Sequence, residues 1–294
     1  MVYYLLSLMS VFEKLKEIIP KIIVGSAKYP TFDSIPDEYP VKNLETLLSM
    51  VTRSYNAGAE GCIFYLYNDE MVQFLNILHR ELRKIKIMLI IKFVDIGEIT
   101  RLMNNLNFTP TALFLDYNLA DQRDNDLINK YINALSKYCK NIGIYTKEPI
   151  GTVSFFITSN PKIKLFLLPF NMLGLGLQNR SLIEMIVNSS ENIYISSNPL
   201  ADGKIKPRQA FEYITTHRIH GSNIEFLDLE TVLDSIKFAK YFLETYDFLQ
   251  IALEFEDHSE VCENCGLGMS RYYPPTGGSW WYCSQCQAKK EMPE

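Results

Sequence analysis

The sequence predicts an α/β fold: a (β/α)8 TIM barrel followed by a small C-terminal zinc ribbon. Short apolar runs alternate with amphipathic helix-like stretches from residue 21 to residue 245. Each run is apolar enough to be buried on both faces, which is typical of parallel strands. The chain then ends in two Cys-x-x-Cys pairs, a spacing typical of a metal-binding module.

Eight strands are predicted in order along the barrel, at residues 21–25, 61–66, 87–93, 112–116, 141–145, 164–168, 193–196 and 223–227. Helices are predicted between and after them, at residues 43–57, 70–82, 99–106, 124–138, 182–188, 207–216 and 229–245. Asp124 and Pro207 suit the starts of their helices. The alternative is a doubly wound open sheet, which the lack of a G-x-G-x-x-G motif after the first strand disfavours.

Four segments divide the 294 residues. Residues 1–20 form an N-terminal extension, and residues 21–245 form the barrel. The acidic stretch within residues 246–258 indicates a linker, and residues 259–294 form the zinc ribbon. A chain of this length can bury a large core and still carry one small module.

Composition excludes some partners. Hydrophobic residues make up 47% of the chain, and the formal net charge is −5. A nucleic-acid-binding surface usually needs a basic field, so nucleic acid is not an expected partner. The strongest basic run is Arg80 to Lys86, but it closes a predicted helix, where cations are favoured by the helix dipole.

The remaining cysteines and the N-terminus indicate the compartment. Cys62 and Cys139 lie in apolar patterns and are expected to be buried and unpaired. Unpaired thiols beside a thiolate zinc site are typical of a reducing compartment. The apolar segment at residues 1–12 is too short to span a bilayer, so the expectation is a cytoplasmic protein without a membrane anchor.

The metal prediction depends on Cys262, Cys265, Cys283 and Cys286. Two pairs at this spacing can offer four thiolates to one tetrahedral Zn²⁺. All four ligand positions are then filled, with no place for a reactive water. The zinc is therefore predicted to be structural.

Aromatic residues gather between the two cysteine pairs, on either side of the hairpin tip at residues 276–279. They are Tyr272, Tyr273, Trp280 and Trp281. In so small a module some of them must cover the metal, and the others are free to contact a partner. The whole module at residues 259–294 holds more acidic than basic residues, which favours a protein partner over a nucleic acid.

In a barrel, chemistry sits where the strands end. Lys92 is predicted to lie inside an apolar strand, where an ammonium needs a carboxylate or a wet cavity. Asp116, on the next strand, is its candidate partner, so Lys92 and Asp116 are the candidate catalytic residues for a small-molecule ligand. A purely structural ion pair is the alternative. Other polar residues follow the strand ends: Tyr65, Tyr67, Asn68, Asp95, Asn118, Tyr145, Lys147, Asn171, Asn198 and Asp202.

Several segments resemble the aldo-keto reductase superfamily over about residues 22–240. They are 56–64, 141–144, 168–173 and 197–203, with Ser197-Asn-Pro-Leu-Ala-Asp-Gly203 similar to that family's strand-seven motif. The resemblance implies the barrel and a nicotinamide cofactor such as NADPH.

The same resemblance implies a catalytic Asp, Tyr, Lys and His, of which only the lysine has a match, at Lys92. No histidine occurs between His79 and His217, and no Lys or Arg occurs between Arg218 and Lys237 to hold the cofactor phosphate.

Two functions therefore remain open. The first is an enzyme acting on a small molecule at the strand ends, either as an oxidoreductase or as a lyase that uses a lysine. The second is a non-catalytic barrel scaffold whose aromatic zinc ribbon docks a protein partner.

Overall fold

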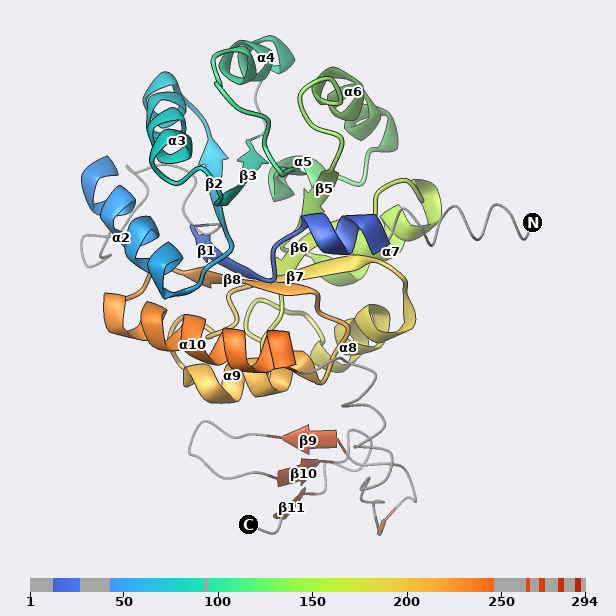
Figure 1. Cartoon of the computed structure of the whole chain (residues 1–294). Helices are drawn as coiled ribbons and strands as arrows, with labels where there is room; N and C mark the ends of the chain where they lie inside the picture. The colour runs from blue at the N-terminus through green and yellow to red at the C-terminus, as the bar shows by residue number, and fades with distance from the viewer. Residues whose placement is uncertain are drawn as a thin grey trace.

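The protein is described from a computed structural model, in which eight parallel strands close into a barrel (Figure 1). The described residues are 13–26, 43–92, 95–245, 263–264, 270–272, 280–282 and 289–291. The strands follow one another in chain order, and the first pairs with the eighth to complete the ring. The predicted (β/α)8 barrel is therefore confirmed, and the open sheet is excluded.

The barrel strands are β1 (Ile22–Gly25), β2 (Gly61–Leu66), β3 (Lys86–Ile91), β4 (Ala112–Leu115), β5 (Ile142–Tyr145), β6 (Leu165–Pro169), β7 (Ile193–Ser197) and β8 (Gly221–Glu225). The helices around them are α2 (Leu44–Ala57), α3 (Asp69–Glu81), α4 (Ile96–Asn104), α5 (Tyr117–Ala120), α6 (Asn125–Leu135), α7 (Pro149–Ser159), α8 (Arg180–Ser189), α9 (Pro207–Thr215) and α10 (Leu229–Thr245).

Several elements differ from the sequence prediction, three of them for reasons that can be named. Helix α7 was not predicted, because its sequence is apolar around most of its surface and rich in β-branched and aromatic residues. The predicted helix 124–138 ends earlier, at Leu135, and the one-turn helix α5 precedes it. Strand β8 begins two residues before its predicted start, at Gly221.

Alternation along the strands divides the core into two layers. Cys62 and Phe64 face the helices, whereas Ile63 and Tyr65 face the barrel interior. The interior cluster consists of Ile19, Ile23, Ile63, Tyr65, Met88, Ile90, Ala112, Phe114, Tyr145, Leu165, Leu167, Ile193 and Ile195. The barrel is therefore filled by side chains, and polar groups can gather only at its two ends.

A helical segment at residues 13–18 lies across the N-terminal end of the barrel (Figure 1). Leu15 and the buried Ile19 pack against the interior cluster. A ring nitrogen of His220 lies 2.9 Å from the carbonyl oxygen of Ile19. This segment closes the N-terminal end, which leaves the opposite end for a site.

The C-terminal part contains three short strands, β9 (Ser270–Tyr272), β10 (Trp280–Tyr282) and β11 (Lys289–Glu291). They form an antiparallel sheet in the order β11-β10-β9. Trp281 is buried, with 5% of its surface exposed. Among the described residues, no helix is long and apolar enough to cross a membrane.

Candidate active site at the C-terminal mouth of the barrel

Inward-facing positions at the ends of four strands place polar side chains at the C-terminal mouth of the barrel. Tyr65 comes from β2, Asp116 directly follows β4, Tyr145 ends β5, and Asn223 lies in β8. All four are at least 97% buried. Because the strands are parallel and closed, residues more than 150 positions apart in the sequence share this mouth.

Asp116 is the buried carboxyl group of the mouth, with 1% of its surface exposed. It is the N-cap of α5, and it accepts hydrogen bonds from the backbone nitrogen and side-chain amide of Asn118, at 3.3 and 3.2 Å. Burial raises the pKa of Asp116 above its ordinary value, while the bonds from Asn118 and the charge of Lys147 offset part of this rise. A carboxyl group in such a setting can hold a proton and release it.

Lys92 and Asp116 directly follow two neighbouring strands, and no ion pair joins them among the described residues. Strand β3 ends at Ile91, one residue before Lys92, so the prediction that Lys92 lies inside the strand was wrong. The register pairs Ile91 with Leu115, which brings Lys92 level with Asp116 on the inward side. Among the ion pairs of the described residues, none joins the two, and Lys92 is half-buried. A catalytic role for either residue stays a prediction.

Lys147 is the cation that acts on Asp116. Its ammonium nitrogen lies 3.7 Å from the centroid of the Tyr117 ring. That ring in turn meets Tyr145 edge-on, with centroids 5.6 Å apart. Sequence analysis placed Lys147 at a strand end but gave no reason to prefer it, because the contact depends on the loop that follows β5.

Asp121 fixes that loop. Its carboxylate accepts hydrogen bonds from the Thr146 hydroxyl, from the Thr152 hydroxyl at 2.7 Å and from the backbone nitrogen of Lys147 at 3.0 Å. Three bonds to one carboxylate restrict the loop, since charge-assisted hydrogen bonds are stronger than neutral ones. The position of Lys147 above Tyr117 is therefore set by a residue of the preceding loop.

Two buried polar atoms of the mouth have no hydrogen-bond partner among the described residues. They are the hydroxyl oxygen of Tyr65 and the amide oxygen of Asn223. The Asn223 amide nitrogen donates to Glu225 at 3.2 Å. Burial raises the pKa of Tyr65 well above its usual range, and Tyr145 and Asp116 raise it further. Buried polar groups are nearly always paired, so two unpaired atoms at one end of the barrel indicate a place for a ligand.

Other strand-end residues serve the scaffold. Asn68 and Asp95 are N-caps, of α3 and α4, which satisfies the first backbone N–H groups of those helices. Asn171 bonds both ways to the backbone of Leu175, and Asn198 accepts from the backbone of Asp202 at 2.8 Å. These side chains hold loops and helix starts in place.

The zinc prediction lies outside this site. Cys262, Cys265, Cys283 and Cys286 lie outside the described residues, as does Tyr273. Within the described part of the chain, no group of three or more His, Cys, Asp or Glu side chains is arranged to hold a metal ion. Cys62 and Cys139 are buried and unpaired, as predicted. Burial raises the pKa of both thiols, which makes them unreactive packing residues.

Comparison with known proteins identifies the class of fold. No family model matches the sequence, and no curated protein matches it. Solved aldo-keto reductases are similar in structure. A Pseudomonas aeruginosa protein described as an aldo-keto reductase superposes with a TM-score of 0.58 at 13% identity, covering 76% of this chain and 90% of that one.

Two further structures agree. Aldose reductase from Giardia lamblia gives a TM-score of 0.54 at 8% identity, with 79% of this chain and 91% of that chain covered. The aldo-keto reductase AKR2E5 of the silkworm Bombyx mori, complexed with NADPH, gives 0.54 at 12% identity, with 85% and 90% covered. At these identities the likeness shows that the chain has the barrel fold of aldo-keto reductases.

Proposed function

We propose that the protein is an enzyme that transfers protons to and from a small polar substrate at the C-terminal mouth of its barrel. The observation that carries the proposal is the combination of Asp116 and Tyr65. A buried carboxyl group with a raised pKa faces the same end of the barrel as a buried hydroxyl that has no hydrogen-bond partner within the described part of the chain. Perturbed ionisable groups at the strand ends of a barrel are typical of active sites.

In this proposal each residue of the mouth has a role that follows from its chemistry. Asp116 is the general acid and base, because burial favours its protonated form and leaves it able to give up that proton. Tyr65 and Asn223 hydrogen-bond polar groups of the substrate. Lys147 and Lys92 supply positive charge at the rim, which suits a substrate with a carbonyl or carboxylate group. A lyase that forms an imine on one of these lysines fits the same arrangement.

An oxidoreductase is the second version. Its support is the fold shared with NADPH-bound AKR2E5. The chain after β8 does not fit the cofactor well, because no Lys or Arg occurs between Arg218 and Lys237 to hold its phosphate. We therefore derive no step through a nicotinamide, and a fluorescence titration with NADPH and NADH tests this version directly.

A library of small carbonyl compounds, followed by thermal shift and ligand-detected NMR, tests the mouth. Asp116→Asn and Tyr65→Phe should each remove binding or turnover of any hit. The control is Asp126→Asn, an exposed carboxylate on α6. Borohydride trapping followed by peptide mass spectrometry reports whether Lys92 or Lys147 forms an imine. Hits that bind all three variants equally would place the ligand elsewhere and end the proposal.

We also propose that Cys262, Cys265, Cys283 and Cys286 hold one structural Zn²⁺. The support is their spacing, together with the three-stranded antiparallel sheet into which the chain around them folds. Elemental analysis should find about one zinc per chain, lost in Cys283→Ser and kept in the control Cys139→Ser. A full zinc content in Cys283→Ser would contradict this ligand set.

The alternative function is a non-catalytic scaffold whose ribbon docks a protein partner through its aromatic residues. Trp281 is buried, so the candidates for such a contact are Tyr272, Tyr273 and Trp280. A pull-down with the full chain and with a chain lacking residues 259–294 separates the two ideas. A partner captured by the full chain alone, together with no ligand at the mouth, would favour the scaffold.

A further inference from the structure

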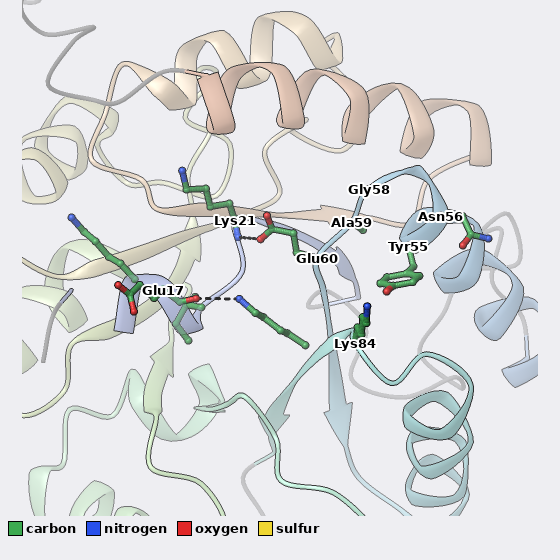
Figure 2. Close-up of a pocket in the computed structure, with 11 residues that line it drawn as sticks. Glu17, Lys21, Tyr55, Asn56, Gly58, Ala59, Glu60 and Lys84 are labelled. Atoms are coloured by element: carbon green, nitrogen blue, oxygen red, sulfur yellow. Dashed lines mark hydrogen bonds between the residues drawn. The ribbon is translucent and has the colours of Figure 1, made fainter. Parts of the chain in front are cut away.

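A cavity of about 680 Å³, open to solvent along one side, lies at the other end of the barrel, between the starts of β1, β2 and β3 and the helical segment at residues 13–18 (Figure 2). Four lysines line it: Lys16, Lys21, Lys84 and Lys86. Its volume is in the range of small-molecule sites, which run from roughly 300 to 1,000 Å³. The mouth described above is at the opposite end, so the two features are independent.

The fold brings these lysines together from distant segments. Lys16 and Lys21 come from the N-terminal segment, whereas Lys84 and Lys86 end the basic run that sequence analysis singled out. Lys240 of α10 does not line the cavity but lies close to its edge. Its side-chain nitrogen would lie 3.6 Å from a Cβ atom at Gly58, a lining residue.

Positive charge exceeds negative charge in the lining. The acidic lining residues are Glu17 and Glu60, and the Glu60 carboxylate already accepts the backbone N–H of Lys21 at 2.8 Å. Lys16 is paired with Glu13, which lies outside the lining, at 3.5 Å, so the charge of Lys16 is partly neutralised. The ammonium groups of Lys21 and Lys86 donate to the carbonyl oxygens of Leu243 and Glu17, at 2.8 and 3.3 Å. Carbonyl groups carry no net charge, so these bonds orient the cations without neutralising them.

Lys84 and Tyr55 give the cavity its binding groups. Lys84 has no hydrogen bond or ion pair among the described residues, and its side chain points toward Tyr55 (Figure 2). The Tyr55 ring is half-buried and forms one wall. A planar aromatic wall beside a group of lysines suits a ligand that joins a flat ring to an anionic group.

We propose that this cavity binds a small molecule that carries a phosphate group and a planar ring, of which a nucleotide is the simplest probe. The lysines bind the phosphate as point charges. The ring packs against Tyr55. In a chain with a net charge of −5, this local excess of cations also attracts anions selectively to one face.

Isothermal titration of the full chain with four probes tests the proposal: AMP, adenosine, ribose 5-phosphate and inorganic phosphate. AMP should bind one to one and most tightly, ribose 5-phosphate more weakly, and adenosine least. The affinity for AMP should fall as salt is added, since screening weakens exposed charge pairs.

Variants locate the ligand. Lys84→Gln with Lys86→Gln should weaken AMP binding by about tenfold or more, as expected for two lost charge contacts. The control with the same change in charge is Lys130→Gln with Lys162→Gln, both exposed elsewhere. Tyr55→Leu should weaken AMP while leaving ribose 5-phosphate unchanged. Thermal melting of each variant verifies that it is folded.

Two results would overturn the proposal. One is no binding of any phosphate compound at about 1 mM, an affinity too weak to matter. The other is equal AMP binding by the Lys84/Lys86 variant and its control. A single-stranded RNA oligomer is a fifth probe; much tighter binding of RNA than of AMP would replace a small-molecule site with a nucleic-acid surface.

Discussion

The ammonium nitrogen of Lys147 lies 3.7 Å above the ring of Tyr117, next to the buried carboxyl group of Asp116. A cation over an aromatic face is stabilised by the ring quadrupole. Its charge also partly opposes the effect of burial on Asp116. One lysine therefore links the aromatic residues of the mouth to its acidic group.

Replacing this lysine should change the titration of Asp116. In Lys147→Gln the favourable charge is lost, so the pKa of Asp116 should rise further above its ordinary value. Side-chain ¹³C NMR of the carboxyl group measures it. Lys137→Gln is the matched control, because Lys137 also lies over a tyrosine, at 4.6 Å from the Tyr138 ring centroid. An unchanged midpoint in Lys147→Gln would show that the two groups do not interact.

Removing the hydroxyl of Tyr65 should separate function from stability. None of the residues that the structure describes bonds to that oxygen, so Tyr65→Phe should leave the free energy of unfolding unchanged or raise it by about 1 kcal/mol. Tyr194→Phe is the opposite case, because its hydroxyl bonds Ser190 at 2.5 Å and Asn192 at 3.3 Å. It should lower stability by roughly 1–3 kcal/mol. Urea unfolding of both variants tests the pair, and a large loss in Tyr65→Phe would mean that its hydroxyl is satisfied.

A glycine inside the barrel should resist substitution. A Cβ atom at Gly143 would lie 2.5 Å from the carbonyl oxygen of Leu165, which belongs to the rigid neighbouring strand. Gly143→Ala should therefore lower stability by roughly 1–3 kcal/mol. At Gly151 the nearest atoms belong to the movable end of Arg123, so Gly151→Ala on α7 should be close to neutral. Equal effects of the two changes would argue against the strand spacing described here.

Acid should destabilise the protein through two half-buried histidines. Burial lowers the pKa of His217 to about 3 and of His220 to about 4, against 6.5 for an ordinary histidine. Between pH 4 and pH 6.5 the histidines of the unfolded chain bind protons that those of the folded chain do not. The free energy of unfolding should therefore fall as the pH drops from 6.5 toward 4, with most of the contribution present above 6.5.

Unfolding curves of wild type and His217→Asn between pH 7 and pH 5 isolate this contribution. The variant should be less stable at pH 7, where it loses the 3.0 Å contact with the Asn188 amide, and should lose less stability on acidification. Parallel curves for wild type and His217→Asn would show that folding does not lower the pKa of His217.

Some elements could be predicted to the residue. The bounds of strand β2 at 61–66 were predicted correctly because the strand is one continuous apolar run. The bounds of helix α10 at 229–245 were predicted correctly because the helix is one long amphipathic stretch. Strand β8 was misplaced by two residues, because Gly221 has no strand-like side chain. Glycine is required there for a tertiary reason: a Cβ atom would lie 2.8 Å from the carbonyl oxygen of Pro20 in the N-terminal segment.

The candidate site was predicted only in part. Sequence analysis placed Asp116 at a strand end, where the structure shows it, because a polar residue directly after an apolar strand is a local signal. The predicted partner of Asp116 was Lys92. In the structure, the cation whose charge offsets part of the rise in the pKa of Asp116 is Lys147, which Asp121 holds from another loop. Nothing in the sequence indicates that Tyr65 and Asn223 each have a buried polar atom without a hydrogen-bond partner among the described residues. Whether such an atom finds a partner depends on all of its neighbours in space.

The amino-acid sequence by itself determined the alternating order of strands and helices, and hence the parallel barrel, because hydrophobic periodicity is a property of short segments. It also determined the cysteine spacing of the C-terminal module. Only the tertiary structure decided which side chains meet. Closure of the ring brings β2, β4 and β8 to one mouth and the four lining lysines to the other end. The physical reason is that charge, burial and hydrogen bonding act through space over a few ångströms, whatever the separation along the chain.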